Sequence, residues 1–478
     1  MASDDARRQA TGVEVTTDSV RVRRCWSIIV SLAMVAVVVG GCTSGSQSAP
    51  DWGPPPQLTP PMGWNSWNSG IPLTEGSVKD TIDAMIRSGM RDAGYRYVNL
   101  DAGWAAPNRE RSGNLRADPD RFPDGIAALA RYAHDRGMLL GLYASPYNEI
   151  CGQGMANASA GHEPADARRF AAWGVDYLKY DWCRSDTNHA DQVRLFTAMR
   201  DALRASGRRI VYSINPTTFS NPAAGSAYDW SGIADMTRNT IDLVPLWGNA
   251  TASWDGFLGV VDQLAAAAGM ADRSRPGHWN DPDMLVVGLS WAQFVSGHSG
   301  MLASLAERGT LTPDQLAQAE LDIPASAQLV AMIGAQRPSL SEVEQRAHFS
   351  LWAMLAAPLL AGNDVRSMPV DTNAILTNRE VIAVDQDPLA IGGRAVAGNS
   401  RIMAKPLVDG SVAVALFNPD KQPASIQTSA TAIGLKSERC YTVRDLWTHT
   451  DASSRGDIEG ADIPSHGVAV LRVTPTCR

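Results

Sequence analysis

The chain has 478 residues, 44% hydrophobic and 19% charged, a balance typical of a folded globular protein rather than a disordered one. This length is greater than one average domain and suits an α/β barrel with a smaller companion. The formal net charge of −8 disfavours a nucleic-acid partner, because binding to phosphates requires clustered Lys and Arg.

The first 57 residues are predicted to lie outside the folded body. Basic residues at 21–24 precede an apolar run, Trp26–Val39, that is too short to span a bilayer, and small residues follow it up to Cys42. This pattern resembles a bacterial lipobox and predicts a lipoprotein signal peptide over 1–41 with lipidation of Cys42. The alternative is a plain signal peptide with a chance Cys. Residues 42–57, rich in Ser, Gly and Pro, are the predicted tether. We therefore expect an exported protein that is either anchored to the cell membrane by a lipid or secreted.

Short apolar segments alternate with longer amphipathic ones after the tether. The predicted strands are Gly63–Trp67, Tyr97–Asp101, Leu139–Tyr143, Tyr177–Asp181, Ile210–Asn215, Met236–Asn239, Met284–Val287 and Leu359–Ala361. The predicted helices between them include Val78–Ser88, Ile126–Arg136, Ala165–Trp173 and Gln192–Ser206. Because parallel strands need crossover helices, eight such repeats predict a (β/α)8 TIM barrel over residues 58–390.

An insertion and a second domain complete the predicted architecture. Residues 289–339 form a long stretch after the seventh predicted strand, with helical patterning at Pro313–Leu321 and Ala325–Met332. From 391 to 478 the pattern becomes β-like, which predicts a C-terminal antiparallel β-sandwich. Its clearest predicted strands are Ser411–Phe417, Arg439–Asp445 and Val468–Val473.

Four cysteines remain for the folded body: Cys151, Cys183, Cys440 and Cys477. An even number in an exported protein predicts disulfides. Chain order favours Cys151–Cys183 and Cys440–Cys477, although three pairings are open. No Cys or His cluster has metal-ligand spacing, so we expect neither a metal nor an organic cofactor.

Polar side chains stand at the carboxyl ends of four predicted strands: Asp101, Tyr143, Asp181 and Asn215. In a barrel of this kind that end carries the active site. Any one of them is equally well explained as an Asx turn or helix cap. Four in series favour a function.

Two carboxyl groups in different environments are what the cleavage of a glycosidic bond requires. Asp181 ends a strand that is otherwise buried, and Lys179 on the same strand face favours its ionised form, so Asp181 is the predicted nucleophile. Asp242 follows a strand end beside Arg238, which suits a proton donor. A capping role is the alternative for both. Retention of configuration requires the two carboxyls to lie about 5–6 Å apart.

Two more segments add polar and aromatic groups to the predicted barrel mouth. Asp281 and Asp283 lie in a polar stretch ahead of a buried run, close enough to bind sugar or to support the groups that do. Trp64 and Trp67 follow the first strand, and we expect one to pack in the barrel and the other to stack on a sugar ring.

Six ordered segments together resemble glycoside hydrolase family 27, the family of α-galactosidases and α-N-acetylgalactosaminidases. The matching stretches are Pro60–Trp67, Tyr97–Asp101, Gly174–Asp181 with Cys183, Arg238–Asp242, Trp279–Leu285 and His348–Leu360. The resemblance implies Asp181 as nucleophile and Asp242 as acid/base of a retaining enzyme. Implied sugar contacts are Trp67, Asp101, Tyr143, Lys179, Arg238 and Asp283. It also implies the Cys151–Cys183 disulfide beside the nucleophile.

Two departures from the family pattern bear on the sugar. The family commonly has two Asp after the second strand, whereas this chain has Asp101-Ala102, and the fifth strand ends in Ile214-Asn215-Pro216 instead of a Cys-Glu-Trp-like segment. Loss of a charge-assisted hydrogen bond of about 1.5–3 kcal/mol is enough to alter sugar preference. An α-galactosidase that removes terminal α-galactosyl residues is the expected activity. The alternative is another family activity, an isomaltose-releasing dextranase or a β-L-arabinopyranosidase.

Two other classes of protein fit the residues less well. A non-catalytic carbohydrate-binding lipoprotein would be expected to lack one of the two carboxylates, and both are present. A metal hydrolase would need a His/Asp ligand set at the strand ends, which the sequence does not offer. The expected partners are a carbohydrate substrate and, through the lipid, a membrane.

Overall fold

The computed structural model describes residues 58–151, 157–182, 184, 188–218, 221–248, 257–298 and 337–476. The predicted signal peptide, Cys42 and the tether lie outside the described residues. So do Cys183, Cys477 and the two helices predicted within the insertion, and these predictions stay predictions.

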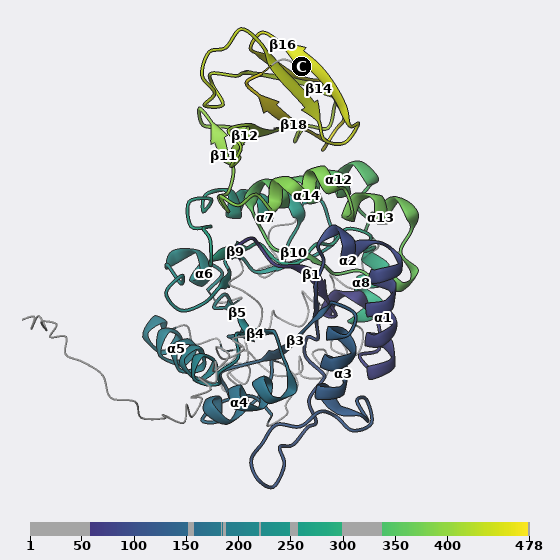
Figure 1. The fold of residues 1–478 in the computed structure, drawn as a ribbon, viewed down its shortest axis with the longest axis vertical. Coiled ribbons are helices and arrows are strands. Elements are labelled where there is room, and N and C mark those ends of the chain that lie inside the picture. Colours follow the sequence, from purple (N-terminus) through teal and green to yellow (C-terminus); the bar gives the residue numbers. More distant parts are fainter. Residues whose placement is uncertain are drawn as a thin grey trace, which may run out of the picture. The chain divides into compact units, whose positions relative to one another are not determined.

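Eight parallel strands curl into a ring (Figure 1), as the sequence predicted. They are β1 (Met62–Asn65), β2 (Tyr97–Asn99), β3 (Leu139–Ala144), β4 (Tyr177–Asp181), β5 (Val211–Asn215), β6 (Met236–Arg238), β9 (Trp279–Asp281) and β10 (Leu359–Ala361). Their order is β10-β1-β2-β3-β4-β5-β6-β9. A parallel bridge between Leu285 and Ala361 joins the segment after β9 to β10 and closes the barrel.

The seventh strand lies earlier than the sequence predicted. The apolar run at residues 284–287 suggested a strand, but β9 occupies Trp279–Asp281, and of that run Leu285 makes the bridge to β10. Polar residues in β9 masked its strand character, because the strand lies in the barrel wall and directs Trp279 and Asp281 inward. The other seven strands lie within two residues of their predicted bounds.

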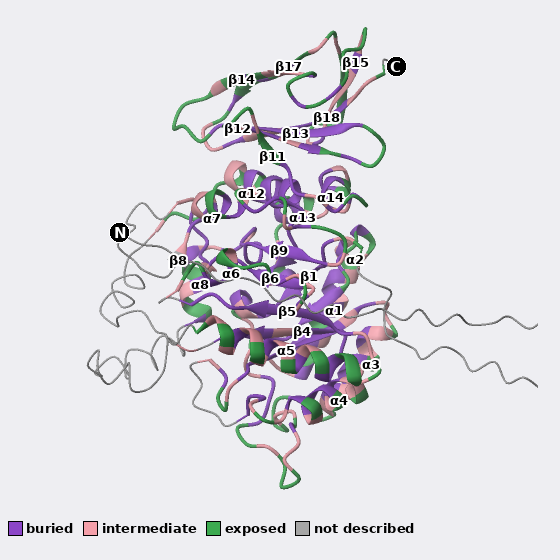
Figure 2. Cartoon of the chain, turned by 90° about the vertical axis from the view of Figure 1, so that its left-hand side faces the viewer, coloured by how far each residue is buried: buried purple, intermediate pink, exposed green. Residues whose placement is uncertain are grey.

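Helices cover the outside of the ring. They are α1 (Glu75–Arg87), α2 (Met90–Ala93), α3 (Gly125–His134), α4 (Glu163–Trp173), α5 (His189–Ala205), α6 (Ala224–Ala227), α7 (Val260–Ala268), α8 (Trp291–Gly297), α12 (Glu342–Leu355), α13 (Val370–Leu376) and α14 (Arg379–Asp385). Two short 3-10 helices, η1 (Trp67–Ser69) and η2 (Val365–Ser367), accompany them, together with a small parallel pair, β7 (Asp242–Leu243) and β8 (Phe257–Leu258). Most helices turn a buried face to the strands and an exposed face outward (Figure 2), as amphipathic sequences require.

Alternation along the strands divides the side chains into two cores. Tyr97, Tyr177, Val211, Met236 and Trp279 pack together inside the ring. The residues that follow them in sequence, such as Val98 and Leu178, join the larger core between strands and helices. The strand period of two therefore decides which side chains face the barrel axis.

The C-terminal region is the predicted antiparallel β-sandwich. One sheet has the order β11-β12-β13-β18-β15-β16, and β14 pairs with β17 in the other. The strands are β11 (Arg394–Val396), β12 (Asn399–Pro406), β13 (Val412–Phe417), β14 (Ala424–Ser429), β15 (Tyr441–Asp445), β16 (Thr450–Ser454), β17 (Asp457–Ile463) and β18 (Val468–Thr474). Side chains of both sheets, including Val414 and Ile458, share one apolar core.

Specific contacts join the sandwich to the barrel helices. The buried Lys405 of β12 donates from its Nζ to the carbonyl oxygen of Ala353 in α12 at 3.1 Å. The Trp447 indole donates to Ser350 Oγ in the same helix at 3.0 Å. Because α12 also donates from Trp352 to the carbonyl oxygen of Asp283 at 3.0 Å, one helix connects the sandwich to the barrel mouth.

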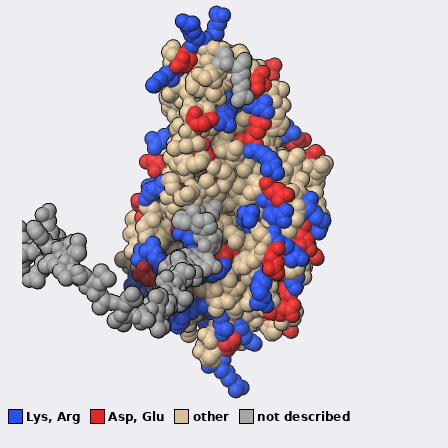
Figure 3. Space-filling view, viewed as in Figure 1, with Lys and Arg blue, Asp and Glu red and all other residues tan. Residues whose placement is uncertain are grey.

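The described surface mixes acidic and basic side chains. The face in Figure 3 shows Lys and Arg interspersed with Asp and Glu, without one dominant sign. Within the residues that the structure describes, every helix falls short of the length and hydrophobicity that a membrane span requires.

Candidate active site

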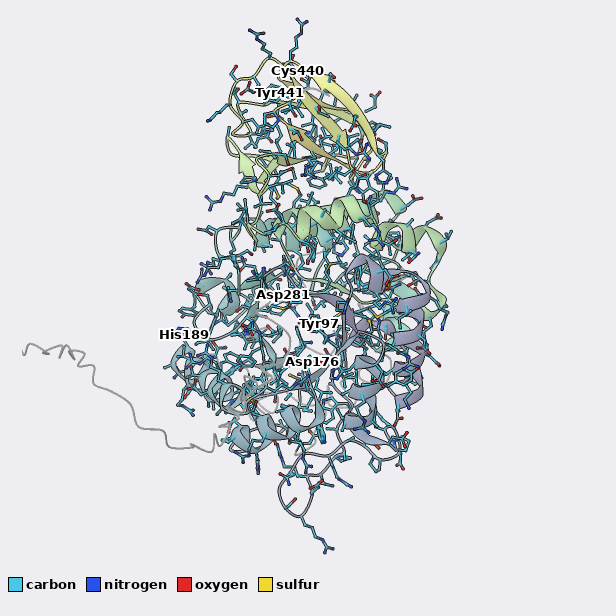
Figure 4. The ribbon with its side chains drawn as sticks, in the orientation of Figure 1. Tyr97, Asp176, His189, Asp281, Cys440 and Tyr441 are labelled. Atoms are coloured by element: carbon cyan, nitrogen blue, oxygen red, sulfur yellow. The ribbon has the colours of Figure 1, made fainter. Side chains whose placement is uncertain are left out.

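Strand β4 carries the first half of the site. Its alternation directs Tyr177, Lys179 and Asp181 toward the barrel axis, while Leu178 and Tyr180 pack against the helices. Tyr177 contributes to the apolar layer inside the ring, and the two ionisable side chains follow it toward the carboxyl end. In Figure 4, Tyr97 of that layer and Asp281 of β9 lie within the ring of strands. The polar residues therefore sit above an apolar floor.

Lys179 bridges two of the predicted carboxylates. Its Nζ lies 2.8 Å from Asp101 Oδ2 and 3.4 Å from Asp181 Oδ2. Asn65 of β1 also donates to Asp101 Oδ2, at 3.0 Å. Burial alone would lower the pKa of Lys179, but the charges of Asp101 and Asp181 raise it well above its usual value. The lysine is thus a fixed cation between the carboxyl ends of β2 and β4.

Asp181 is buried, and this changes its titration. Burial raises the pKa of Asp181 to about 6, the nearby Lys179 opposes that rise, and Asp101 adds to it. The charge of Asp242 also raises it, while Arg238 lowers it. The two predicted catalytic carboxyls therefore act on each other electrostatically and belong to one site.

Arg238 organises the second half of the site. Its Nη2 donates to Asp242 Oδ1 at 3.0 Å, and its Nη1 lies 3.2 Å from Asp283 Oδ1. The Arg238 side chain is 4% exposed, whereas that of Asp242 is 45% exposed and that of Asp181 12%. One carboxyl is thus more accessible to solvent than the other, as different roles in acid–base chemistry require. Asp242 begins β7 and is not a helix cap.

Asp283 adopts a backbone conformation that is uncommon outside glycine, with φ of 80°. This conformation is held by several contacts. Its Oδ2 accepts from the Leu243 N–H at 2.8 Å, and its own N–H donates to Asp281 Oδ1 at 2.9 Å. Strained backbone of this kind persists where the surroundings determine it fully, and it gathers at functional sites.

Two other predicted residues, Tyr143 and Asn215, lie on the strands that flank β4. Tyr143 is buried, lies in register with Lys179 on the neighbouring strand and donates to Cys151 Sγ at 2.9 Å. Asn215 lies in register with Asp181, and its side-chain oxygen accepts from the Thr217 N–H at 3.1 Å. That bond is the Asx turn considered as the alternative.

The two tryptophans of the first strand separate as expected. Trp64 is fully buried, and its indole donates to the carbonyl oxygen of Asn363 at 2.9 Å. Trp67 is half-buried at the start of η1, with its ring edge-to-face against His298 at 5.3 Å. Of the two rings, that of Trp67 is therefore the more exposed.

The structure adds Asn65, which sequence reasoning did not select, and places Asp281 in the network as one of the two acids considered there. Asn65 supports Asp101, and Asp281 lies beside Asp283, with burial raising the pKa of Asp281 to about 6 and Arg238 opposing that rise. Strand alternation was a usable signal, because Asn65 follows Gly63 and Asp281 follows Trp279 at the inward spacing of two. In the described part of the chain, no group of three or more His, Cys, Asp or Glu side chains is arranged to hold a metal ion.

Comparison with known proteins identifies the family. Residues 59–307 and 328–387 match the family described as alpha galactosidase A, and residues 397–473 match the alpha galactosidase C-terminal beta sandwich domain. The chain belongs to glycoside hydrolase family 27.

Relatives of this family resemble the chain over most of its length. It is 36% identical over 421 residues to an alpha-galactosidase of Oryza sativa subsp. japonica, covering 87% of this chain and 85% of that protein. It is 34% identical over 433 residues to alpha-galactosidase A of Cellvibrio japonicus, covering 87% and 92%. The crystal structure of alpha-galactosidase I from Mortierella vinacea matches with a TM-score of 0.71 and 28% identity, covering 88% and 98%. This family 27 protein is therefore a glycoside hydrolase.

Proposed function

We propose that this family 27 protein is a retaining α-galactosidase that removes terminal α-galactosyl residues from oligo- or polysaccharides. The observation that carries the mechanism is the shared charge network. Lys179 holds the buried Asp181, Arg238 holds the more exposed Asp242, and the two carboxyls act on each other. The relatives support galactose as the sugar, because those at 34–37% identity are named alpha-galactosidases.

The reaction proceeds in two displacements. A carboxylate oxygen of Asp181 attacks the anomeric carbon while the bond to the leaving oxygen breaks, and that oxygen takes the proton of Asp242. The Asp242 carboxylate then removes a proton from water. The water oxygen attacks the anomeric carbon and releases Asp181, so that the configuration is retained.

Positive charge develops on the sugar in both transition states, and the site residues are suited to it. We assign sugar binding to Trp67, Asp101, Tyr143, Lys179, Asn215, Arg238 and Asp283. Arg238 retains hydrogen-bonding capacity, since its buried Nε has no acceptor among the described residues.

A panel of nitrophenyl glycosides tests the activity and the sugar together. Hydrolysis of the α-galactoside, in preference to the α-glucoside and the β-L-arabinopyranoside, is expected, and the first sugar released is expected in the α configuration by NMR. Asp181→Ala is expected to abolish turnover, with partial rescue by azide. A fully active Asp181→Ala, or release of the β anomer, would refute the proposal.

We also propose how the protein is exported and anchored, which cysteines pair and where the domains end. We infer export and lipidation at Cys42 from the basic residues and apolar run before it, with residues 1–41 removed. We also assign the disulfides Cys151–Cys183 and Cys440–Cys477, and domain limits of 58–390 and 391–478. Fractionation of cells that express Cys42→Ala tests the anchor, because the protein should move from membranes to the medium.

A further inference from the structure

His298, near the start of the predicted insertion at residues 289–339, packs against Trp67. His298 is the C-cap of helix α8, and its ring meets that of Trp67 edge-to-face at 5.3 Å and lies 4.4 Å from that of Phe294. The backbones approach closely here, because a Cβ added to Gly297 would fall 2.7 Å from the Cα of Gly70. The position of His298 is therefore fixed by packing against the segment that carries Trp67.

His298 lies within electrostatic range of two site carboxylates. Burial lowers the pKa of His298, and the charges of Asp242 and Asp101 act in the opposite direction. With only 5% of the residue exposed and no ion pair recorded for it among the described residues, the ring is neutral at neutral pH.

The hydrogen bonding of the ring fixes its tautomer. Nδ1 lies 2.7 Å from the carbonyl oxygen of Phe294, which only accepts, so Nδ1 carries the proton. The other nitrogen, Nε2, is then an acceptor. It is buried, and no group in the described part of the chain donates to it. Buried acceptors are seldom left without a donor, because the loss of hydration is then not compensated.

We propose that His298 is a further substrate-binding residue, whose Nε2 accepts a hydrogen bond from a hydroxyl of the sugar held between Asp101 and Asp242. A sugar hydroxyl supplies the donor that Nε2 lacks. The residue after Asp101 is Ala102, whose side chain has no hydrogen-bonding atom, so an acceptor supplied by His298 would add to the polar groups available to the sugar. This inference rests on the proposed function.

Three variants separate binding from packing. His298→Phe keeps an aromatic ring against Trp67 and removes the acceptor, while His298→Gln keeps an acceptor oxygen. His278→Phe is the matched control, because His278 is also buried and its Nδ1 lies 2.8 Å from the carbonyl oxygen of Ala234. The charged groups acting on His278 are Arg275, Asp229 and Arg273, which lie outside the site.

The substrates are nitrophenyl α-galactoside and its monodeoxy analogues. We expect His298→Phe to lower kcat/KM on the parent sugar by about 10- to 100-fold, the effect of removing one hydrogen bond to a substrate hydroxyl. One monodeoxy analogue should show almost no difference between the variant and the wild type. His298→Gln should recover part of the activity, and His278→Phe should show no dependence on the deoxy position.

An equal loss on the parent and on every analogue would overturn the proposal, as would an unchanged kcat/KM on the parent sugar. Thermal unfolding of each variant establishes that the proteins compared are folded. Failure of the proposed function is a separate result, because it appears in the wild type, as absence of α-galactoside hydrolysis. The comparison at His298 would then be made on whichever glycoside of the panel the wild type cleaves.

Discussion

Replacement of Lys179 by Met is expected to move the acid limb of the pH–activity profile to higher pH. Turnover needs Asp181 ionised, and the pKa of this carboxyl is about 6, so kcat/KM of the wild type should fall as the pH drops through about 6. Lys179 favours the ionised form from 3.4 Å. Without this cation, Asp181 takes up a proton more readily.

The distance sets the size of the effect. Two unit charges 3.4 Å apart interact by about 5 kcal/mol at an effective dielectric constant of about 20. This would correspond to roughly 3–4 pKa units as an upper bound. Water and nearby dipoles reorganise around the remaining charges, so the measured effect is smaller than this bound. A rise of about 1–3 units is therefore expected, which places the acid limb between about pH 7 and 9.

The assay is kcat/KM on nitrophenyl α-galactoside across the pH range in which the variant remains folded. Lys421→Met is the matched control, because this lysine is exposed on the C-terminal sandwich and its loss should leave the limb near 6. Met keeps most of the length of the lysine stem, so the packing changes little. A Lys179→Met profile whose acid limb coincides with that of the wild type would show that Lys179 does not set the ionisation of Asp181.

Three further changes test the site and the fold. Arg238→Ala leaves Asp242 and Asp283 without their cation and should lower kcat/KM by at least about 100-fold. A loss below tenfold in steady-state kinetics would contradict the proposed role of Arg238. Gly141→Ala places a Cβ against the side chain of Asn99 inside the barrel and should destabilise the fold by about 1–3 kcal/mol in urea unfolding, whereas Gly76→Ala, with open space around it, should not. Lys405→Met removes a fully buried ammonium and should lower the free energy of unfolding by about 2–4 kcal/mol. An unchanged temperature of thermal unfolding would show that this buried contact contributes nothing to stability.

The period of the strands accounts for most of what the sequence predicted. Tyr177–Asp181 has the same bounds in the sequence prediction and in the structure, because its apolar residues alternate with Lys179 and Asp181 around a short buried run. Asp101, which the sequence placed at the carboxyl end of the second strand, lies beside the cation Lys179. The local sequence is sufficient to predict a strand where apolar and polar residues alternate along it.

Other features depend on contacts that the local sequence does not encode. β9 was displaced in the prediction because its polar residues face the barrel interior and so resemble a loop. The orientation of the Asn215 amide depends on Thr217, whose N–H donates to the Asn215 side-chain oxygen. His298 carried no signal at all, because its proximity to Trp67 arises between segments more than 200 residues apart, through the packing of α8 on η1.

The charge balance of the site explains both its titration and its chemistry. Five carboxyl groups, Asp101, Asp181, Asp242, Asp281 and Asp283, surround two permanent cations, Lys179 and Arg238. Burial raises the pKa values of Asp181 and Asp281 to about 6, and the negative charge of neighbouring carboxylates adds to the rise. A transition state with positive charge on the sugar relieves this excess of negative charge, since the carboxylates then face a cation that the resting site lacks. The two fixed cations hold the carboxylates in place without neutralising them all. The charge imbalance that raises these pKa values therefore also favours the transition state over the neutral substrate.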